Sequence, residues 1–214
     1  EVVWEAGPWE DQRRTGMIDG HRCRLRLAGR HDVGNAAAAY AVLREFGVSA
    51  MDAMEAMESV TPEAMRLTPR QCGHAVVWND AYNANPESIR SAMAAFADLV
   101  EPDRPRVLVL GEVLELGEWS EQAHQELGVS IAQSHAADPF QEILLVGDAF
   151  SSVAAHLRAD GLPVRHASEA LSLQEQFCSM LEYPVAVLMK GSRGTGLERL
   201  LPSAEEEPLS GSMG

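Results

Sequence analysis

The chain has 214 residues and carries 32 acidic against 17 basic side chains, which gives a formal net charge of −15. Its hydrophobic fraction of 46% and charged fraction of 23% are typical of a globular protein with a substantial core. The acidic balance argues against nucleic acid or an anionic membrane surface as a partner. No apolar run reaches the roughly 18 residues of a membrane span.

Residues 1–58 are expected to form a first unit. Polar and apolar residues alternate over 23–27, which predicts a strand, and the alanine-rich stretch 33–46 predicts a helix. Ser49 is expected to cap a second helix. The prolines and the glycine of residues 59–73 predict a linker to a second domain.

From residue 74 to residue 202, predicted strands alternate with predicted helices. The strands are expected at 75–78, 107–110, 143–146, 163–165 and 185–189, and the helices at 86–100, 120–137, 150–159, 169–181 and 197–201. Because the longer strands lack polar alternation, we expect an α/β fold with a mostly parallel, Rossmann-like sheet covered on both faces. The acidic, Ser/Gly-rich tail at 203–214 is expected to be disordered.

The three cysteines and seven histidines show no metal-binding spacing. Cys23, Cys72 and Cys178 are far apart and form no CxxC pair, which favours a reducing, cytoplasmic environment. The histidines form no HExxH motif, so we expect no metal ligands from this chain. The chain begins at Glu1 with a strand-like pattern already under way, so we expect a fragment of a longer protein.

Ligands of such a fold bind at the carboxyl ends of the parallel strands. The loop after the first of these strands contains Asp80, Tyr82, Asn83 and Asn85, which together offer many hydrogen-bonding groups. This density is typical of a site for sugar hydroxyls or a base edge. The alternative is an elaborate turn that leads into a helix.

Two further loops follow predicted strands. Glu112 and Glu115 lie between glycines, either near substrate or Mg²⁺ or in a solvated acidic loop. Lys190, Ser192 and Arg193 belong to a glycine-rich loop that resembles an anion cradle but also fits a helix-capping turn. Lys190 is the single lysine of the chain.

A fourth candidate site lies in the first unit. His31 and Asn35 are four residues apart, so they share a face at the predicted start of a helix. A histidine beside an asparagine at a helix start is a modest indication of ligand contact.

Four stretches resemble, in order and spacing, motifs of the Mur ligases of the MurF type. They are D-A-Y-N-A-N-P at 80–86, the helix start at 29–38, L-G-E-V-L-E-L-G-E at 110–118 and M-K-G-S-R-G at 189–194. The resemblance covers residues 23–201. It implies the end of a central ATPase domain followed by a complete Rossmann-like C-terminal ligase domain.

The resemblance also implies an activity for the complete protein. Ligases of this type use ATP and Mg²⁺ to activate UDP-N-acetylmuramoyl-tripeptide as an acyl phosphate, which the amine of D-alanyl-D-alanine attacks during peptidoglycan synthesis. We expect a cytoplasmic monomer. The alternatives are a Mur-type ligase for another amino acid and a non-catalytic nucleotide- or dipeptide-binding module; the sequence upstream of Glu1 would separate them.

The motif positions imply residue roles. The implied nucleotide contacts are His31, Asn35, Arg66, Asp80 and Tyr82, with Asn35 against adenine, Asp80 on the ribose and Arg66 near the phosphates. The implied substrate contacts are Asn83, Asn85, Glu112 and Glu115. Lys190, Ser192 and Arg193 are implied to face the dipeptide or the reacting charge.

The chain departs from the family pattern at three points. Asp32 replaces an asparagine of the helix-start motif, and Met65 stands where a glycine is usual. The ATP-cradling P-loop and its lysine have no counterpart, since Lys190 is the single lysine. We therefore predict that the isolated chain hydrolyses no ATP above background; measurable Mg²⁺-dependent turnover would overturn this.

Overall fold

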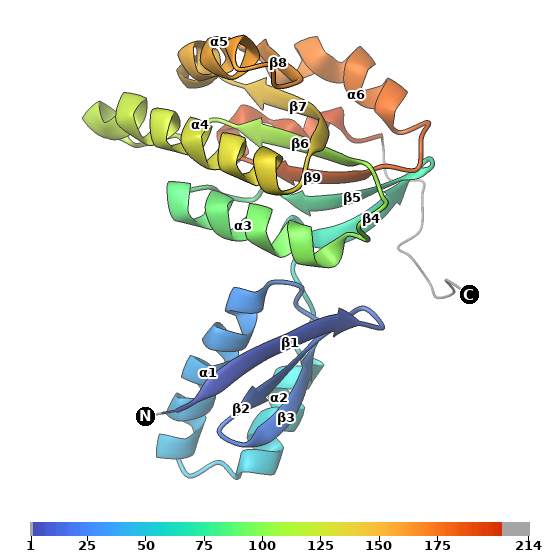
Figure 1. Ribbon diagram of the computed structural model, residues 1–214. Helices are drawn as coiled ribbons and strands as arrows, with labels where there is room; N and C mark the ends of the chain where they lie inside the picture. Colours follow the sequence, from blue (N-terminus) through green and yellow to red (C-terminus); the bar gives the residue numbers. More distant parts are fainter. Residues whose placement is uncertain (1, 203–214) are drawn as a thin grey trace. The chain divides into compact units, whose positions relative to one another are not determined.

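The computed structural model describes residues 2–202, which divide into two compact units on either side of the Glu63–Ala64 bond (Figure 1). The expected disordered tail, 203–214, lies outside the described residues. Within the described part of the chain, no helix is both long and apolar enough to cross a membrane.

The first unit is a three-stranded antiparallel sheet packed against two helices. Its elements are β1 (Trp4–Glu10), β2 (Arg13–Ile18), β3 (His21–Leu25), α1 (Arg30–Glu45) and α2 (Ala50–Ser59). Ser49 caps α2 as predicted, because its hydroxyl accepts a hydrogen bond from the Asp52 backbone N–H at 3.1 Å. The sequence predicts the strand that corresponds to β3 and a strand-like start of the chain, but not β2. A bulge between Ala6 and Trp9 breaks the alternation of β1.

The second unit contains a six-stranded sheet in the order β4-β5-β9-β6-β7-β8. Its strands are β4 (Thr68–Cys72), β5 (Ala75–Asp80), β6 (Arg106–Gly111), β7 (Phe140–Val146), β8 (Val164–Ala167) and β9 (Ala186–Lys190). All neighbours are parallel except the β4–β5 pair, so the mostly parallel α/β sheet is confirmed. Residues 68–72 were predicted as part of a linker, but they pair with β5 as an edge strand. Pro69 is compatible with this strand because an edge position does not need every backbone N–H.

Helices cover both faces of this sheet (Figure 1). One face is covered by α3 (Pro86–Leu99), α4 (Ser120–Ala137) and α5 (Ser151–Ala159). The other face is covered by η3 (Ala170–Leu173), α6 (Gln174–Met180) and η5 (Leu197–Leu200). The helix predicted at 169–181 is therefore a 3₁₀ turn followed by a short α-helix.

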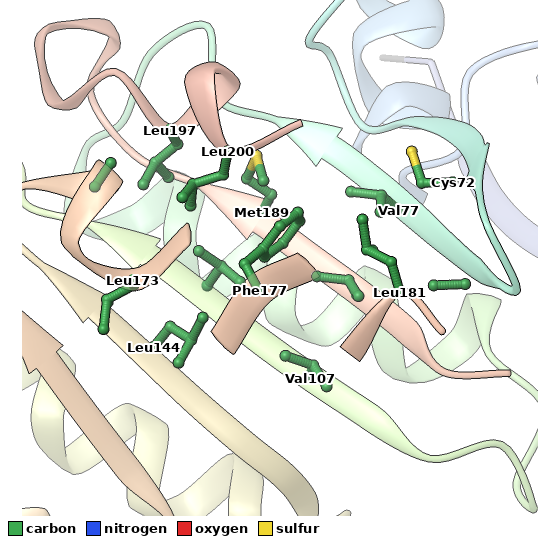
Figure 2. Close-up of a cluster of buried hydrophobic side chains, with 14 of the residues drawn as sticks. Cys72, Val77, Val107, Leu144, Leu173, Phe177, Leu181, Met189, Leu197 and Leu200 are labelled. Atoms are coloured by element: carbon green, nitrogen blue, oxygen red, sulfur yellow. The ribbon is translucent and has the colours of Figure 1, made fainter. Parts of the chain in front are cut away.

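The core beneath α6 shows how these strands bury alternate side chains (Figure 2). Phe177 of α6 packs over Val107, Leu144 and Met189, which come from three neighbouring strands. In β6, Leu108 lies between Val107 and Val109 of this cluster, and it is fully buried on the opposite face of the sheet, as the two-residue period of a strand requires. The strands are apolar on both sides, which is why they read as continuous hydrophobic runs.

The connections place a crevice at the end of β9. The chain leaves β5 and β6 toward α3 and α4, but it leaves β9 toward η5 on the opposite face. Neighbouring strands whose connections diverge in this way open a gap at their carboxyl ends, where ligands of doubly wound folds bind.

Candidate functional site

The carboxyl ends of three strands lie side by side at this crevice. Asp80, the last residue of β5, is in register with Lys190, the last residue of β9, and Lys190 is also in register with Leu110 of β6. Three loops that are far apart in sequence therefore start from adjacent positions. These are the three loops that were predicted to carry the site because each follows a parallel strand, and the structure brings them together.

Lys190 is buried, with 3% of its surface exposed. Its Nζ donates to Asp80 Oδ2 at 2.8 Å, to the Asn83 carbonyl at 3.1 Å and, at 3.5 Å, to the Asp80 carbonyl. An ammonium has three donors, and all three are used within the fold. In this structure Lys190 thus holds the loop after β5 in place, and its predicted role at the dipeptide stays a prediction.

Asp80 connects Lys190 to the segment before β4. Its Oδ1 accepts a hydrogen bond from the Leu67 backbone N–H at 3.2 Å, and the Met65 carbonyl accepts one from the Tyr82 N–H at 3.3 Å. Met65 and Leu67 adopt positive φ angles of 63° and 49°. This explains a preference for glycine at the position of Met65, and the paired turns direct Arg66 toward Tyr82.

Three predicted residues meet at Tyr82. The Arg66 guanidinium carbon lies 4.3 Å from the centre of the Tyr82 ring, and that of Arg193 lies 5.6 Å from it. Both distances are in the range of cation–π contacts. Tyr82 remains 40% exposed. We call Arg66, Tyr82 and Arg193 the Tyr82 cluster; it offers two cations and an aromatic ring to an anionic ligand.

Ser192 is also directed into the fold. It is 6% exposed, and its Oγ accepts a hydrogen bond from the Leu114 N–H at 3.0 Å. Its carbonyl accepts hydrogen bonds from the Thr195 N–H at 2.9 Å and the Thr195 hydroxyl at 2.6 Å. Ser192 thus closes the turn after β9, as in the capping alternative, and its predicted role at the reacting charge stays a prediction.

Asn83 and Asn85 shape the turn between β5 and α3. Asn85 is the N-cap of α3: its Oδ1 accepts from the Ser88 N–H at 2.7 Å, and its own N–H donates to Ser88 Oγ at 3.0 Å. The side chain of Asn83 accepts from the Ala84 N–H at 2.8 Å. The turn interpretation therefore accounts for both amides, although both residues are exposed.

A pocket of about 300 Å³ opens beside Glu112 at the carboxyl ends of β6, β7 and β9. We call it the Glu112 pocket; its lining includes Glu112, Gly147, Ser168, Glu169, Thr195 and Arg199. The lining combines carboxylates, a guanidinium and hydroxyls with the apolar side chains of Ala170 and Leu171. A small ligand that carries both an ammonium and a carboxylate fits this chemistry.

Glu112 is fixed within the pocket by its neighbours. Its Oε2 accepts a hydrogen bond from the Ala149 N–H at 3.0 Å, which leaves the carboxylate capacity for further donors. A Cβ on Gly147 would stand 2.4 Å from the Glu112 Cδ, so the close approach requires glycine. Glu115 is exposed with φ of 66°, and it is not among the residues that line the pocket.

In the first unit, His31 and Asn35 are both exposed on the first turns of α1. Asp32 performs a local structural role there, because its Oδ2 accepts a hydrogen bond from the Gly29 N–H at 2.9 Å. Its charge also favours the positive end of the helix. The aspartate found in place of the usual asparagine therefore stabilises the helix start.

No group of three or more His, Cys, Asp or Glu residues within the described chain is arranged to hold a metal ion. The Tyr82 cluster does fit an anionic group, through its two guanidinium groups and exposed ring.

Sequence reasoning missed the loops after β7 and β8. Gly147, Ser168 and Glu169 line the pocket, and they follow strands just as the predicted loops do. They would have been found if the loop after every parallel strand had been treated as a candidate ligand-binding loop. The loops contain too few polar residues to stand out by composition.

Comparisons with known proteins agree on one family. Residues 65–193 match the family described as Mur ligase, glutamate ligase domain. The UDP-N-acetylmuramoyl-tripeptide–D-alanyl-D-alanine ligase of Bacillus subtilis is 31% identical over 188 residues, which cover 86% of this chain and 40% of that protein. The ligase of the same name from Escherichia coli is 29% identical over 198 residues, covering 91% of this chain and 41% of that protein.

Solved structures show the same correspondence. A crystal structure of MurF from Acinetobacter baumannii superposes with a TM-score of 0.77 and 28% identity, covering 92% of this chain and 42% of that chain. MurF from Thermotoga maritima, solved in complex with ADP, has a TM-score of 0.74 at 19% identity, over 93% of this chain and 44% of that one. The chain therefore spans less than half the length of the relatives that it matches.

Proposed function

Because the chain belongs to the Mur ligase family, we propose that it is the C-terminal part of an ATP-dependent UDP-N-acetylmuramoyl-tripeptide–D-alanyl-D-alanine ligase of peptidoglycan synthesis. The relatives from B. subtilis and E. coli carry this name. The observation that carries the proposal is the Glu112 pocket, which opens at the same sheet edge as the Tyr82 cluster. In this proposal an acceptor amine and an anionic nucleotide bind at separate places at adjacent strand ends.

The Tyr82 cluster is the proposed contact surface for ATP. When bound, ATP supplies the phosphoryl group that activates the tripeptide carboxylate. Arg66 and Arg193 offer positive charge to the phosphates, and Asp80 is the proposed ribose contact. In the first unit, His31 and Asn35 are the proposed contacts to the base. The part of the complete ligase that this chain does not contain is expected to supply the Mg²⁺ ligands.

The Glu112 pocket is the proposed acceptor site. D-Alanyl-D-alanine carries an ammonium, a carboxylate and two methyl groups. Glu112 would bind the ammonium and Arg199 the carboxylate, both through charge-assisted hydrogen bonds. Ala170 and Leu171 provide apolar surface for the methyl groups. Asn83, Asn85 and Glu115 stay proposed contacts only for the part of the substrate that lies outside this pocket.

Replacing Glu112 by glutamine should weaken binding of D-alanyl-D-alanine to this chain by about tenfold or more, since a hydrogen bond to a charged group contributes about 1.5–3 kcal/mol. Calorimetric titration of the chain with the dipeptide measures the effect. The matched control is Glu118→Gln, because Glu118 is an exposed carboxylate of the same loop. Equal affinities for the two variants, or no binding to the wild-type chain, would contradict the proposal.

The titration also separates the alternatives. Tighter binding of D-glutamate or meso-diaminopimelate than of the dipeptide would favour a Mur-type ligase for a single amino acid. We expect the dipeptide to bind tighter, because the lining also offers the apolar side chains of Ala170 and Leu171 to its two methyl groups.

A further inference from the structure

His124 lies on α4, beneath the loop that carries Glu112, and its side chain is completely buried. Its Nε2 accepts a hydrogen bond from the Val113 N–H at 3.0 Å, and its Nδ1 lies 2.7 Å from the Ser120 carbonyl. A backbone N–H can only donate and a carbonyl can only accept. The two partners therefore fix the ring as the neutral tautomer with its proton on Nδ1.

The His124 contact is one of three successive anchors of this loop. The N–H groups of Glu112, Val113 and Leu114 donate, in turn, to the Val146 carbonyl of β7, to His124 of α4 and to Ser192 Oγ after β9. Each anchor comes from a different element. The backbone on both sides of the Glu112 side chain is thus tied to the sheet and to the helix layer.

His124 also contacts the element that holds the Glu112 carboxylate. Its ring packs edge-on against Phe150, with centroids 4.8 Å apart and planes at 86°. Phe150 is the last residue of η2 (Asp148–Phe150), and the neighbouring Ala149 N–H donates to Glu112 Oε2 at 3.0 Å. One buried ring therefore supports both the backbone next to Glu112 and the donor that orients its carboxylate.

We propose that His124 is a positioning residue of the acceptor site. As a neutral imidazole it accepts the Val113 N–H and packs against Phe150, and in this way it holds the Glu112 carboxylate in the orientation that binds the acceptor ammonium. That Glu112 binds the acceptor ammonium rests on the proposed function. That His124 orients Glu112 rests only on the contacts of the histidine ring.

Two variants separate the hydrogen bond from the bulk of the ring. His124→Asn is too short to reach the Val113 N–H, whereas His124→Gln retains an amide oxygen that can accept it. His135→Asn is the matched control, because His135 also lies on α4, accepts the Phe140 N–H at 3.1 Å and packs against an aromatic ring away from the pocket.

The first readout needs no ligand. Proton-detected ¹⁵N spectra of the wild-type chain should show His124 protonated at Nδ1. Amide hydrogen exchange at Ala149 should accelerate about threefold to tenfold in His124→Asn, in keeping with the loss of one hydrogen bond, and return toward wild type in His124→Gln. Unchanged exchange at Ala149 in His124→Asn, or equal acceleration in His135→Asn, would overturn the proposal.

The second readout is a double-mutant cycle with Glu112→Gln on the affinity for D-alanyl-D-alanine. If His124 acts through Glu112, His124→Asn weakens binding in the wild-type background and adds nothing in the Glu112→Gln background. Additive losses would show that His124 merely stabilises the fold and would overturn the proposal. If Glu112→Gln alone leaves affinity unchanged, the acceptor site is wrong, and the exchange at Ala149 still decides whether His124 holds Glu112.

Discussion

Replacing Lys190 by methionine is expected to lower the free energy of unfolding of the second unit by about 3–5 kcal/mol, the cost of leaving one partner of a buried ion pair without the other. The ammonium is the cation paired with Asp80, at 2.8 Å, and the two side chains are 4% and 16% exposed. Methionine retains the apolar length of the lysine stem, so the loss reports the charge and its hydrogen bonds. Chemical denaturation followed by fluorescence measures it.

The double variant Lys190→Met with Asp80→Asn is the control for this interpretation. It removes the unpaired carboxylate charge, so a substantial part of the lost stability should return. Lys190→Met could instead unfold at the same denaturant concentration as the wild type. That result would show that the ammonium is not engaged inside the fold and would favour the predicted role of Lys190 at the substrate.

Replacing Gly191 by alanine is expected to cost about 1–3 kcal/mol of stability through overpacking. A Cβ at this position would stand 2.8 Å from the Gly111 Cα and 2.9 Å from the Gly111 N. Both are backbone atoms at the ends of paired strands, so neither can move aside without separating β9 from β6. The distortion would reach the Glu112 pocket, because Glu112 directly follows Gly111.

Gly194→Ala is the matched control for Gly191→Ala. A Cβ there would meet only the Leu114 Cδ1, at 2.6 Å, which is the end of a side chain that is 40% exposed and can turn away. Thermal unfolding of the two variants should therefore differ clearly, with Gly194→Ala close to the wild type. Equal melting temperatures would show that the backbone at Gly111 leaves room for a Cβ at position 191.

The parallel sheet could be predicted because its strands are buried on both faces. Runs such as 107–110 and 143–146 are apolar at every position, and helical stretches separate them, so both the fold class and the loop positions follow from the sequence. The antiparallel strands were harder to detect. The bulge in β1 breaks its alternation, and Pro69 in β4 is typical of a linker as well as of an edge strand.

Whether the side chains of the site residues point into the fold or toward a ligand could not be predicted from the sequence. The sequence indicates Lys190 as a candidate, but its burial depends on Asp80, which is 110 positions away and is brought alongside only by the β5–β9 pairing. A lysine beside a carboxylate at a strand end becomes either a ligand contact or an internal support. The choice depends on the depth of the side chain, which local sequence does not encode.

The same limit applies to His124. The histidine shows no motif beyond Ser120 one turn earlier on α4, and its function as an acceptor for Val113 arises only when the loop after β6 folds over the helix. The Tyr82 cluster, by contrast, consists of residues that all belong to predicted segments. The structure shows in addition that Arg66 and Arg193 both contact the exposed ring of Tyr82.

The amide chemical-shift map of the 214-residue chain, titrated with D-alanyl-D-alanine, tests most directly whether the Glu112 pocket is the acceptor site. We expect the largest shifts at Gly147, Ala149 and Thr195, which lie in or beside the pocket, and little change at Asn83. Shifts concentrated at Asn83 and its neighbours, or an unchanged spectrum at saturating dipeptide, would contradict the assignment of the acceptor to this pocket.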